Sequence, residues 1–444
     1  MNHIEDFVTL VRESYEHQDR EQFSQLISID ETHGVVSGLM QALNQLNETQ
    51  VEKLVTSQLE DTSFALSECM VNYLHMIRYL YDTDIEALFE KFATFYSSFI
   101  PVFNGSDTFY QVPVMNTLST NLVELALSVD KTGLKGKARK ANTAARLLSK
   151  VFNIMLADRS PIDSSKRQGI FHVTNLAFKV YFRLNSMRMC QTFISNIRTG
   201  GLDLDLFPIS QQVTYKYYLG RYALYNGQLK KAQDCLLFAF QKCHIGHWHN
   251  KRVILHYLIP TRIILGHFPS LQLLETYGLT APYADLLKAL RSGHLKGYLQ
   301  HLETYFDYFY SHLTYLLLKE RGIVLVWRCL IKNMYHQKQK LNQTIPVIEF
   351  RDCLKAFYFA SPTGTSYTVE DMECILVSLV SQNYIRGYLQ HSKQRLVLSK
   401  VNAFPPISHV RVHVERYNEA VLEDHMMHAQ PPLPEEIQAY IDQE

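Results

Sequence analysis

The sequence predicts an all-α protein with one small β wing: a solenoid of helical hairpins that ends in a winged helix. Proline and glycine are sparse, at 14 and 18 of 444 residues, and the stretches between them place apolar residues three and four positions apart. Short polar breaks recur through the middle of the chain. A single pair of strands with alternating apolar residues follows the last helices.

Composition and charge are those of an ordinary folded protein. Apolar residues make up 47% of the chain and charged residues 20%, and the net charge is only +1. Any contact with nucleic acid must therefore come from local basic patches. The amphipathic N-terminus carries acids, unlike a targeting peptide, and no apolar run approaches the roughly 18 residues that span a bilayer. We expect a soluble, intracellular protein that makes no membrane contact.

The seven cysteines lie far apart in the sequence, and no CxxC pair occurs. An odd, scattered set in a chain of this size indicates reduced thiols in the core.

The N-terminal part, residues 1–170, is expected to be helical, with an irregular apolar pattern up to about Leu127. A basic loop interrupts it, reading DKTGLKGKARK from Asp130 to Lys140, with five basic residues against one acid. Its two glycines predict a turn or a mobile loop.

Residues 171–337 are expected to form the helical-repeat part. Polar breaks occur around Asn185, Gly227, Gly266 and Gly293, at intervals of 42, 39 and 27 residues. Each unit has the pattern of a helix, a tight turn and a second helix, which is typical of an α-solenoid. In the clearest unit, 215–240, small residues such as Gly220 fall where a tetratricopeptide-like hairpin needs close contact.

Residues 338–406 predict a winged helix. One helix is introduced by Pro346, and Thr368 is expected to cap a second, with Asp371 in the capping-box position. Two strands follow, YIRGYLQ and RLVLSK, joined by the turn HSKQ. In the second strand, Leu396 and Leu398 are expected to face the side opposite Arg395 and Val397.

The last segment, 407–444, is expected to be an acidic tail. Residues 411–444 hold two basic residues and eight acids, a net charge of −6, and include QPPLPEE. We expect a short helix and then a mobile tail.

A helical-hairpin solenoid that runs into a winged helix resembles the PCI domain of the proteasome lid, the signalosome and translation initiation factor three. The closer resemblance is to the PCI-domain protein family of the transcription-coupled mRNA export complex, also described as signalosome subunit-twelve-like. It covers residues 171–406 well and the N-terminal third loosely. The stretches that carry it are QQVTYKYYLGRYALYNGQLKKAQDCLLFAFQKCH (Gln211–His244), NKRVILHYLIPTRIILGH (Asn250–His267) and IRGYLQHSKQRLVLSKVNAFPP (Ile385–Pro406).

The resemblance implies a non-enzymatic scaffold or adaptor that couples transcription to mRNA export at the nuclear pore. Its implied partners are a larger PCI-domain protein, bound through the winged helix, a very small acidic proteasome-lid and export protein that wraps the PCI domain, and RNA or DNA. The implied location is the nucleus, at the nuclear envelope or pore, with the cytoplasm as an additional site. The alternative is a structural subunit of a splicing- or signalosome-associated PCI complex without direct nucleic-acid binding.

Two basic segments are candidate nucleic-acid-binding sites, because Lys and Arg neutralise phosphates and release counterions. Tyr384 and Tyr388 beside the wing are candidates for base stacking. A solvated edge strand protected by charge is the alternative for the wing, and a basic loop or part of a nuclear-import signal is the alternative for the other segment. The wing, which no acid interrupts in sequence, offers Arg386, Lys393, Arg395 and Lys400, and the loop offers Lys131, Lys135, Lys137, Arg139 and Lys140. We expect no opposing charge near the wing cations, and we expect the loop to belong to the same positive surface.

Two other segments are assigned to structure. CHIGHWHN, from Cys243, lacks the second pair of ligands that a zinc site needs and is interpreted as a His-rich loop between helices. The aromatic run from Tyr298 to Leu318 is interpreted as core and subunit-contact surface, since no cations interleave it to favour base stacking.

The sequence contains none of the motifs HExxH, GxSxG, GxGxxG or an EF-hand loop. We therefore expect no enzymatic activity, no small-molecule substrate, no cofactor and no bound metal.

Overall fold

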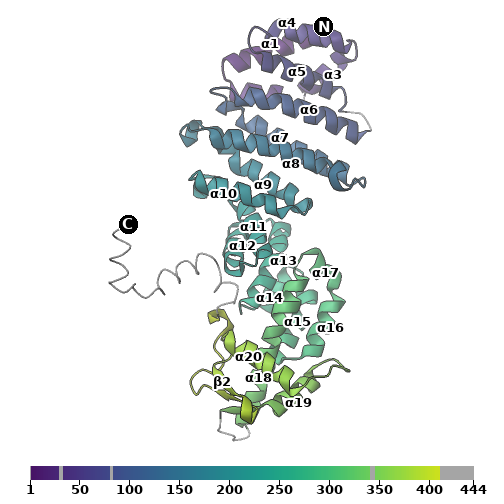
Figure 1. Cartoon of the computed structure of the whole chain (residues 1–444). Coiled ribbons are helices and arrows are strands. Elements are labelled where there is room, and N and C mark those ends of the chain that lie inside the picture. Colours follow the sequence, from purple (N-terminus) through teal and green to yellow (C-terminus); the bar gives the residue numbers. More distant parts are fainter. Residues whose placement is uncertain (1, 30–33, 81–83, 341–345, 411–444) are drawn as a thin grey trace, which may run out of the picture. The chain divides into compact units, whose positions relative to one another are not determined.

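A computed structural model describes residues 2–29, 34–80, 84–340 and 346–410. Within these ranges the chain forms twenty α-helices and three short strands, which confirms the predicted fold class (Figure 1). None of the helices in the described part is long and apolar enough to cross a membrane. The contacts divide the chain into two compact units, Met1–Tyr218 and Leu219–Glu444. The domain limits expected from the sequence differ from this division and stay predictions.

The first unit is built of helices that pack mainly on their neighbours in sequence. Contacts join α5 to α6, α6 to α7, α7 to α8 and α8 to α9, and these helices lie in successive layers (Figure 1). The helices are α1 (Asn2–Glu16), α2 (Arg20–Leu26), α3 (Gly34–Leu43), α4 (Glu48–Leu59), α5 (Phe64–Ile77), α6 (Ile85–Asn104), α7 (Val112–Asp130), α8 (Lys140–Ala157), α9 (Ile170–Arg183), α10 (Cys190–Thr199) and α11 (Ile209–Tyr225), whose last turns lie beyond Tyr218.

Aromatic side chains fill the core of this unit. The rings of Tyr73 and Phe95 lie 5.3 Å apart, and those of Phe23 and Phe99 lie 6.4 Å apart, all four fully buried. Each large ring removes much apolar surface from water, and such tilted and stacked pairs add about 1 kcal/mol beyond burial. The apolar spacing that predicted an irregular helical region therefore corresponds to α1–α7.

The second unit continues the helical hairpins and ends in the winged helix. Its helices before that subdomain are α12 (Leu229–Lys242), α13 (Trp248–Ile264), α14 (Leu271–Thr276), α15 (Thr280–Ser292), α16 (Leu295–Thr304), α17 (Phe306–Ser311), a π-helical turn at Leu317–Gly322, and α18 (Ile323–Lys340).

The four predicted breaks are helix ends. Asn185, Gly227, Gly266 and Gly293 have φ angles of 54°, 74°, 83° and 75°, the left-handed conformation that commonly terminates a helix. At Gly293 a Cβ atom would lie 2.5 Å from the backbone of Leu330, so this glycine also permits the close approach of α15 to α18.

The tetratricopeptide-like contact predicted at Gly220 is confirmed. A Cβ atom there would lie 2.7 Å from the Leu236 side chain, so α11 and α12 pack closely at this point. Leu236 is fully buried.

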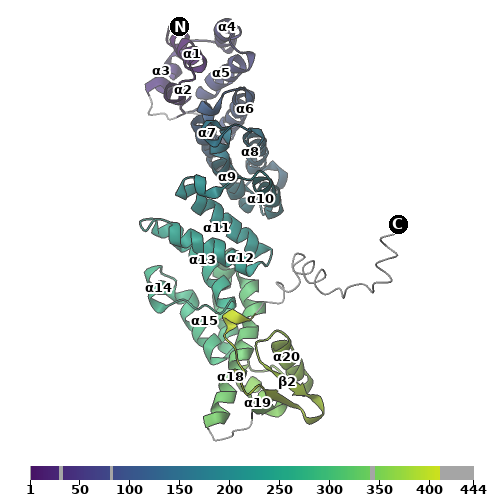
Figure 2. The ribbon, with the colours of Figure 1, turned by 90° about the vertical axis from the view of Figure 1, so that its left-hand side faces the viewer.

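The winged helix contains one strand more than predicted. Its elements are β1 (Val347–Glu349), α19 (Phe350–Ala360), α20 (Val369–Ser381), β2 (Gly387–Gln390) and β3 (Arg395–Leu398), gathered beside α18 (Figure 2). The strands form an antiparallel sheet in the order β1-β3-β2. The helix expected from Pro346 is therefore wrong over its first turn: residues 347–349 are extended because Ile348, fully buried, pairs with Leu396.

Two further predictions for this subdomain are confirmed. Thr368 caps α20, since its Oγ1 accepts the Asp371 N–H at 3.2 Å while the Asp371 carboxylate accepts the Thr368 N–H at 2.8 Å. Leu396 and Leu398 are buried, whereas Arg395 and Val397 are half-buried on the other face.

A buried arginine holds the base of the wing. Arg328 of α18 is 4% exposed, and its guanidinium donates to the carbonyl oxygens of Tyr384, at 3.3 Å, and Pro405, at 2.6 Å. These carbonyls precede β2 and follow β3, so one side chain ties both ends of the hairpin to the solenoid. Burial lowers the pKa of Arg328, and the two bonds compensate the cost of desolvating its charge.

The seven cysteines all lie in the described part of the chain, and none of them is in a disulfide. Six are buried, as expected for core thiols, and Cys374 on α20 is exposed. The acidic tail expected at 407–444 lies outside the described residues from 411 onward.

Candidate nucleic-acid interface

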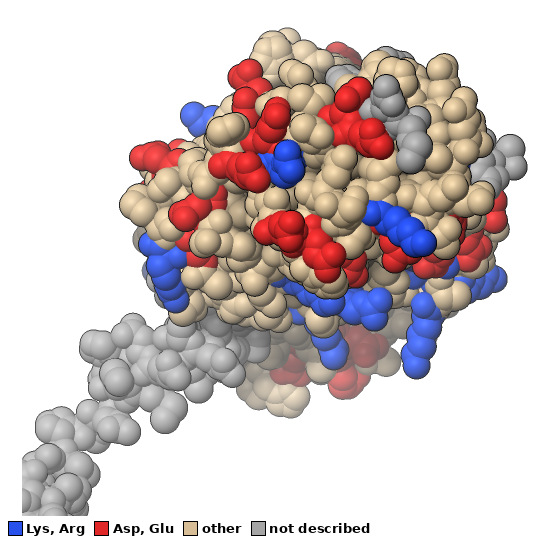
Figure 3. Space-filling view, turned by 90° about the horizontal axis from the view of Figure 1, so that it is seen from above, with Lys and Arg blue, Asp and Glu red and all other residues tan. Residues whose placement is uncertain are grey.

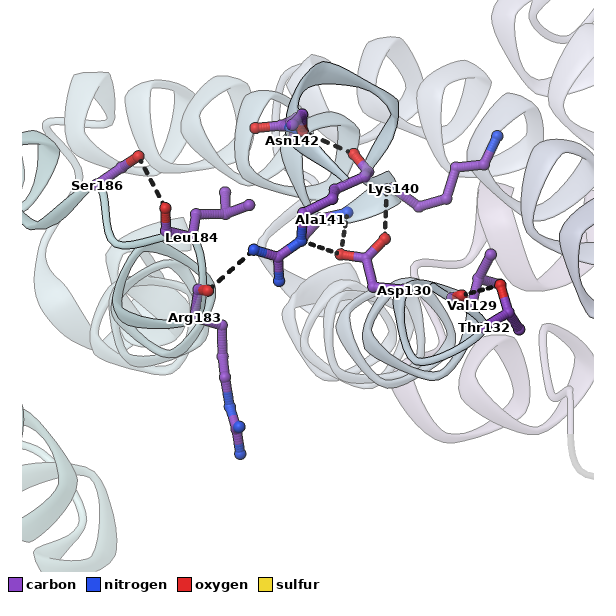
Figure 4. Close-up of polar contacts among 11 residues, drawn as sticks. Val129, Asp130, Thr132, Lys140, Ala141, Asn142, Arg183, Leu184 and Ser186 are labelled. Atoms are coloured by element: carbon purple, nitrogen blue, oxygen red, sulfur yellow. Dashed lines mark hydrogen bonds and ion pairs between the residues drawn. The ribbon is translucent and has the colours of Figure 1, made fainter. Parts of the chain in front are cut away.

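The basic loop, residues 130–140, joins α7 to α8. Its one acidic residue, Asp130, binds groups at the other end of the loop. Asp130 ends α7, and its side chain is 5% exposed. Its carboxylate accepts the N–H of Lys140 at 2.6 Å, the N–H of Ala141 at 3.4 Å and Nε of Arg139 at 3.2 Å (Figure 4). A carboxylate that binds the free amides at a helix start stabilises that start. Asp130 therefore fixes both ends of the loop.

Two of the five loop cations are engaged within the fold. Arg139 also donates to the Arg183 carbonyl at 3.1 Å. Lys140 lies 2.8 Å from Glu86 and 2.5 Å from Glu90 of α6, and its side chain is 16% exposed. Hydrogen bonds to those two carboxylates raise the pKa of Lys140. Lys131, Lys135 and Lys137 remain exposed to solvent and available to an anion.

The loop also borders a shallow pocket of about 440 Å³ that the sequence did not predict. Lys179 and Arg183 of α9 line it together with Lys131 and Arg139, beside Glu124 and Asp130. The Arg183 side chain points away from the Asp130 network (Figure 4). The sequence signal for these two cations was their i, i+4 spacing on one helix, which places them on one face. Nothing local in the sequence related that face to the loop.

The N-terminal end of the first unit has the opposite character. Acidic side chains gather on this end when it is viewed from above (Figure 3). Exposed acids of α1 and α4 contribute to this character: Asp6, Glu13, Glu16, Glu48 and Glu52. A polyanion would be repelled there, so within this unit the loop and its pocket are the better phosphate surface.

The wing, residues 386–400 with β2, β3 and their turn, presents most of its predicted cations to solvent. Arg386, Lys393 and Lys400 are exposed. Arg395 is half-buried, and its Nε donates to the Gln390 side chain at 2.5 Å across the strand pair. The loop belongs to the first unit and the wing to the second, so the prediction that they form one positive surface stays a prediction.

The expectation that no opposing charge stands near the wing is wrong. Both carboxylate oxygens of Glu373 on α20 lie 2.9 Å from Nδ1 of His391 at the turn. Glu349 of β1 is the register partner of Arg395. Both acids come from elements other than the hairpin, so reading the hairpin sequence alone overstated its positive field.

The two tyrosines beside the wing differ in access. Tyr388 is 57% exposed and remains available to stack on a base. Tyr384 is 5% exposed, and burial raises the pKa of its hydroxyl. The stacking role expected for Tyr384 is therefore wrong, because its side chain belongs to the core of the winged helix.

The helix that a DNA-reading winged helix would insert into the groove carries acids. In α20, Glu370, Asp371 and Glu373 occupy the first two turns, and the helix has no Lys or Arg. Its exposed positions include Cys374 and Val377. Carboxylates repel phosphates, and small apolar groups suit a protein contact.

The remaining candidate segments have structural roles. The His-rich segment joins α12 to α13 as predicted, but the connection is shorter than expected, because α13 begins at Trp248 and includes residues 248–250. No group of three or more His, Cys, Asp or Glu that could hold a metal occurs within the described ranges. In the aromatic run, Tyr298 and Phe309 are fully buried core residues. Tyr310 and Leu316, at 62% and 61% exposed, lie on the surface.

Known proteins match this chain over most of its length. A comparison with protein-family models found no match. PCI domain-containing protein 2 of Danio rerio is 32% identical over 319 residues, 70% of this chain and 77% of the relative. The Dictyostelium discoideum homolog is 30% identical over 380 residues, 82% and 86% of the two chains. PCI domain-containing protein 2 of Xenopus laevis is 28% identical over 421 residues, 92% and 98%. Together with the helical hairpins and the terminal winged helix, these matches show that this chain belongs to the family of PCI domain-containing proteins.

Proposed function

We propose that this chain is a non-enzymatic scaffold subunit of a nuclear complex that couples transcription to mRNA export at the nuclear pore. In this complex it contributes basic surface for RNA or DNA. Family membership supports the scaffold role, because the matched relatives carry PCI-domain names. The resemblance of its repeats and winged helix to the export-complex family motivates the specific assignment.

One observation carries the proposal: in the winged helix α20 carries acids and no Lys or Arg, whereas the wing carries exposed cations. The carboxylates of α20 disfavour insertion into a DNA groove, whereas Arg386, Lys393 and Lys400 on the wing are open to phosphates. This arrangement suits a subunit that docks a protein through α20 and holds a nucleic-acid backbone with its wing. Such contacts position a strand without reading its sequence.

The proposed partners come from the resemblance to the export-complex family. A larger PCI-domain protein binds the winged helix, and a very small acidic protein wraps the PCI domain. The proposed location is the nucleus, at the envelope or pore, with the cytoplasm as a second site. Mass spectrometry of the complex isolated from cells tests this part, since a splicing-type partner in place of an export-type partner would contradict it.

Retention of a single-stranded RNA of about 16 nucleotides tests the nucleic-acid role. Replacing Arg386, Lys393, Arg395 and Lys400 together with Glu is expected to abolish retention by the purified complex, with the circular dichroism of the helices unchanged. Because Arg395 bonds Gln390, a second variant changes only the three exposed cations. Unchanged retention in both variants would reject the wing as the binding face.

A second function is favoured by the acids beside the wing. Glu373 and Glu349 weaken its positive field, as expected if the cations meet an acidic protein surface instead of RNA. In that case the chain is a structural subunit of a splicing- or signalosome-associated complex. A gel-shift titration then detects no RNA binding by the chain or by the complex, while the Glu variants lose a protein subunit.

A further inference from the structure

A groove in the second unit is lined mostly by apolar side chains, with Gln241, Arg262 and His267 as its polar members. It encloses about 290 Å³ between α12, α13 and α14. Leu237, Phe240 and Leu273 are half-buried on its walls, and Leu258 and Ile259 are buried beneath them. An exposed apolar groove of this kind is a common binding site for apolar groups of a ligand or partner.

Among the polar groups at the groove, Arg262 favours the binding of an anion. Arg262 and His267 both line it. The Nε of Arg262 is buried and has no hydrogen-bond partner among the described residues. A buried, unpaired donor of a charged group is costly, and a carboxylate is its strongest acceptor.

The chain itself leads to this groove. Gly266, next to His267, is in tight contact with the segment that follows the wing: a Cβ atom on Gly266 would lie 2.6 Å from Cβ of Ile407 and 2.8 Å from the Ser408 amide. The described chain ends at Val410, three residues after Ile407. The last described residues therefore lie close to the groove, and the 34 residues that follow them in sequence are long enough to reach any part of it.

The chemistry of residues 411–444 complements the groove. They carry a net charge of −6, which suits the guanidinium of Arg262. Near their end, LPEEIQAYIDQE places Ile437, Tyr440 and Ile441 at helical spacing, with Glu435, Glu436 and Asp442 between and around them. This is an apolar stripe bordered by carboxylates.

We propose that the C-terminal segment 411–444 folds back over the groove between α12, α13 and α14. In this arrangement Ile437 and Ile441 enter the apolar hollow, and a neighbouring carboxylate accepts from Arg262. The segment is then an internal competitor for any acidic, apolar ligand of the same groove. This inference is independent of the nucleic-acid role proposed above.

Tethering makes such a contact effective even when it is intrinsically weak. A linked segment has an effective concentration of about 1 mM. With a dissociation constant of about 0.1 mM, it would occupy the groove about nine-tenths of the time and slow local amide exchange about tenfold.

Hydrogen exchange of the full-length chain tests the proposal. The variant Ile437→Asp with Ile441→Asp is compared with the wild type and with Gln438→Asp plus Gln443→Asp, which adds the same charge but keeps the apolar stripe. The first variant is expected to speed exchange about tenfold in Gly266–Thr276, while the charge-matched control behaves like the wild type. Leu273→Asp on the groove side is expected to release the amides around Ile437.

Three results would overturn the proposal. Equal exchange in all of these proteins would show that the groove is not covered by this segment. Protection that rises with concentration over an about tenfold range would assign the groove to a second copy. A loss of protection confined to the segment, with the groove unchanged, would place its contact elsewhere.

Discussion

The basic loop and the wing are both rich in Lys and Arg, but they differ in how many of these cations form ion pairs with acids of the fold. In the loop, Arg139 and Lys140 are bound by Asp130, Glu86 and Glu90. In the wing, the side chains of Arg386, Lys393 and Lys400 are exposed. Two of the loop cations form ion pairs that hold α6, α7 and α8 together. A count of cations along the sequence therefore overestimates the positive potential that a ligand meets.

The largest expected effect comes from breaking the support of the wing. Arg328→Met is expected to lower the free energy of unfolding by about 2–4 kcal/mol, because two buried carbonyls lose their donor. Urea unfolding followed by circular dichroism measures this loss. The exposed Arg351 provides the control, since Arg351→Met is expected to change stability by less than about 0.5 kcal/mol. Equal losses in both variants would contradict the role given to Arg328.

A smaller loss is expected when the support of the loop is removed. Asp130→Ala leaves the first amides of α8 without their acceptor and frees Arg139, so it should cost about 1–2 kcal/mol of unfolding free energy. Faster amide exchange at Lys140 and Ala141 would locate the effect. The exposed Asp163, changed to Ala, serves as the control. An unchanged midpoint for Asp130→Ala would show that the loop is not held by this carboxylate.

Neutralising equal numbers of exposed cations in the loop and in the wing tests which of the two binds RNA. One variant changes Lys131, Lys135 and Lys137 to Gln, and the other changes Arg386, Lys393 and Lys400. If the three cations removed contact three phosphates, their loss should reduce the slope of log affinity against log salt by about 2 in magnitude. We expect this for the wing variant in a gel-shift titration with single-stranded RNA. A fall of the same size in the loop variant would show that both surfaces bind the strand, and a fall in the loop variant alone would reverse the assignment.

Two lysines of the same loop are expected to differ slightly in their contribution to stability. Lys140→Gln is expected to lose about 0.5 kcal/mol of stability, because its bridges to Glu86 and Glu90 are partly exposed, and to leave RNA affinity unchanged. Lys137→Gln is expected to leave stability unchanged, since Lys137 is exposed. Thermal unfolding and gel shifts on both variants measure these effects. An RNA defect in Lys140→Gln would show that its ion pairs open to admit a phosphate.

Local signals in the sequence predicted the local features of the fold. Asn185 and Gly293 marked helix ends because they adopt the left-handed conformation there. The pattern of Thr368 and Asp371 predicted a capping box because both partners lie within one turn. Strand alternation in Arg395–Leu398 predicted which face is buried.

Features that depend on distant partners could not be predicted in this way. The strand at Val347–Glu349 exists because it pairs with β3, almost fifty residues later. Glu90 lies fifty residues before Lys140, which it neutralises. Lys179 and Arg183 join the loop only through the packing of α9 against α7 and α8. Candidate cations were thus visible in the sequence, but their availability was decided by tertiary contacts.

One cysteine of this protein can be labelled selectively. Because the other six cysteines are buried, Cys374 is the position that a maleimide dye would label in the unmodified protein. That dye would sit on the outer face of α20, where a protein partner is proposed to dock. Its fluorescence would report formation of the complex without any engineered mutation.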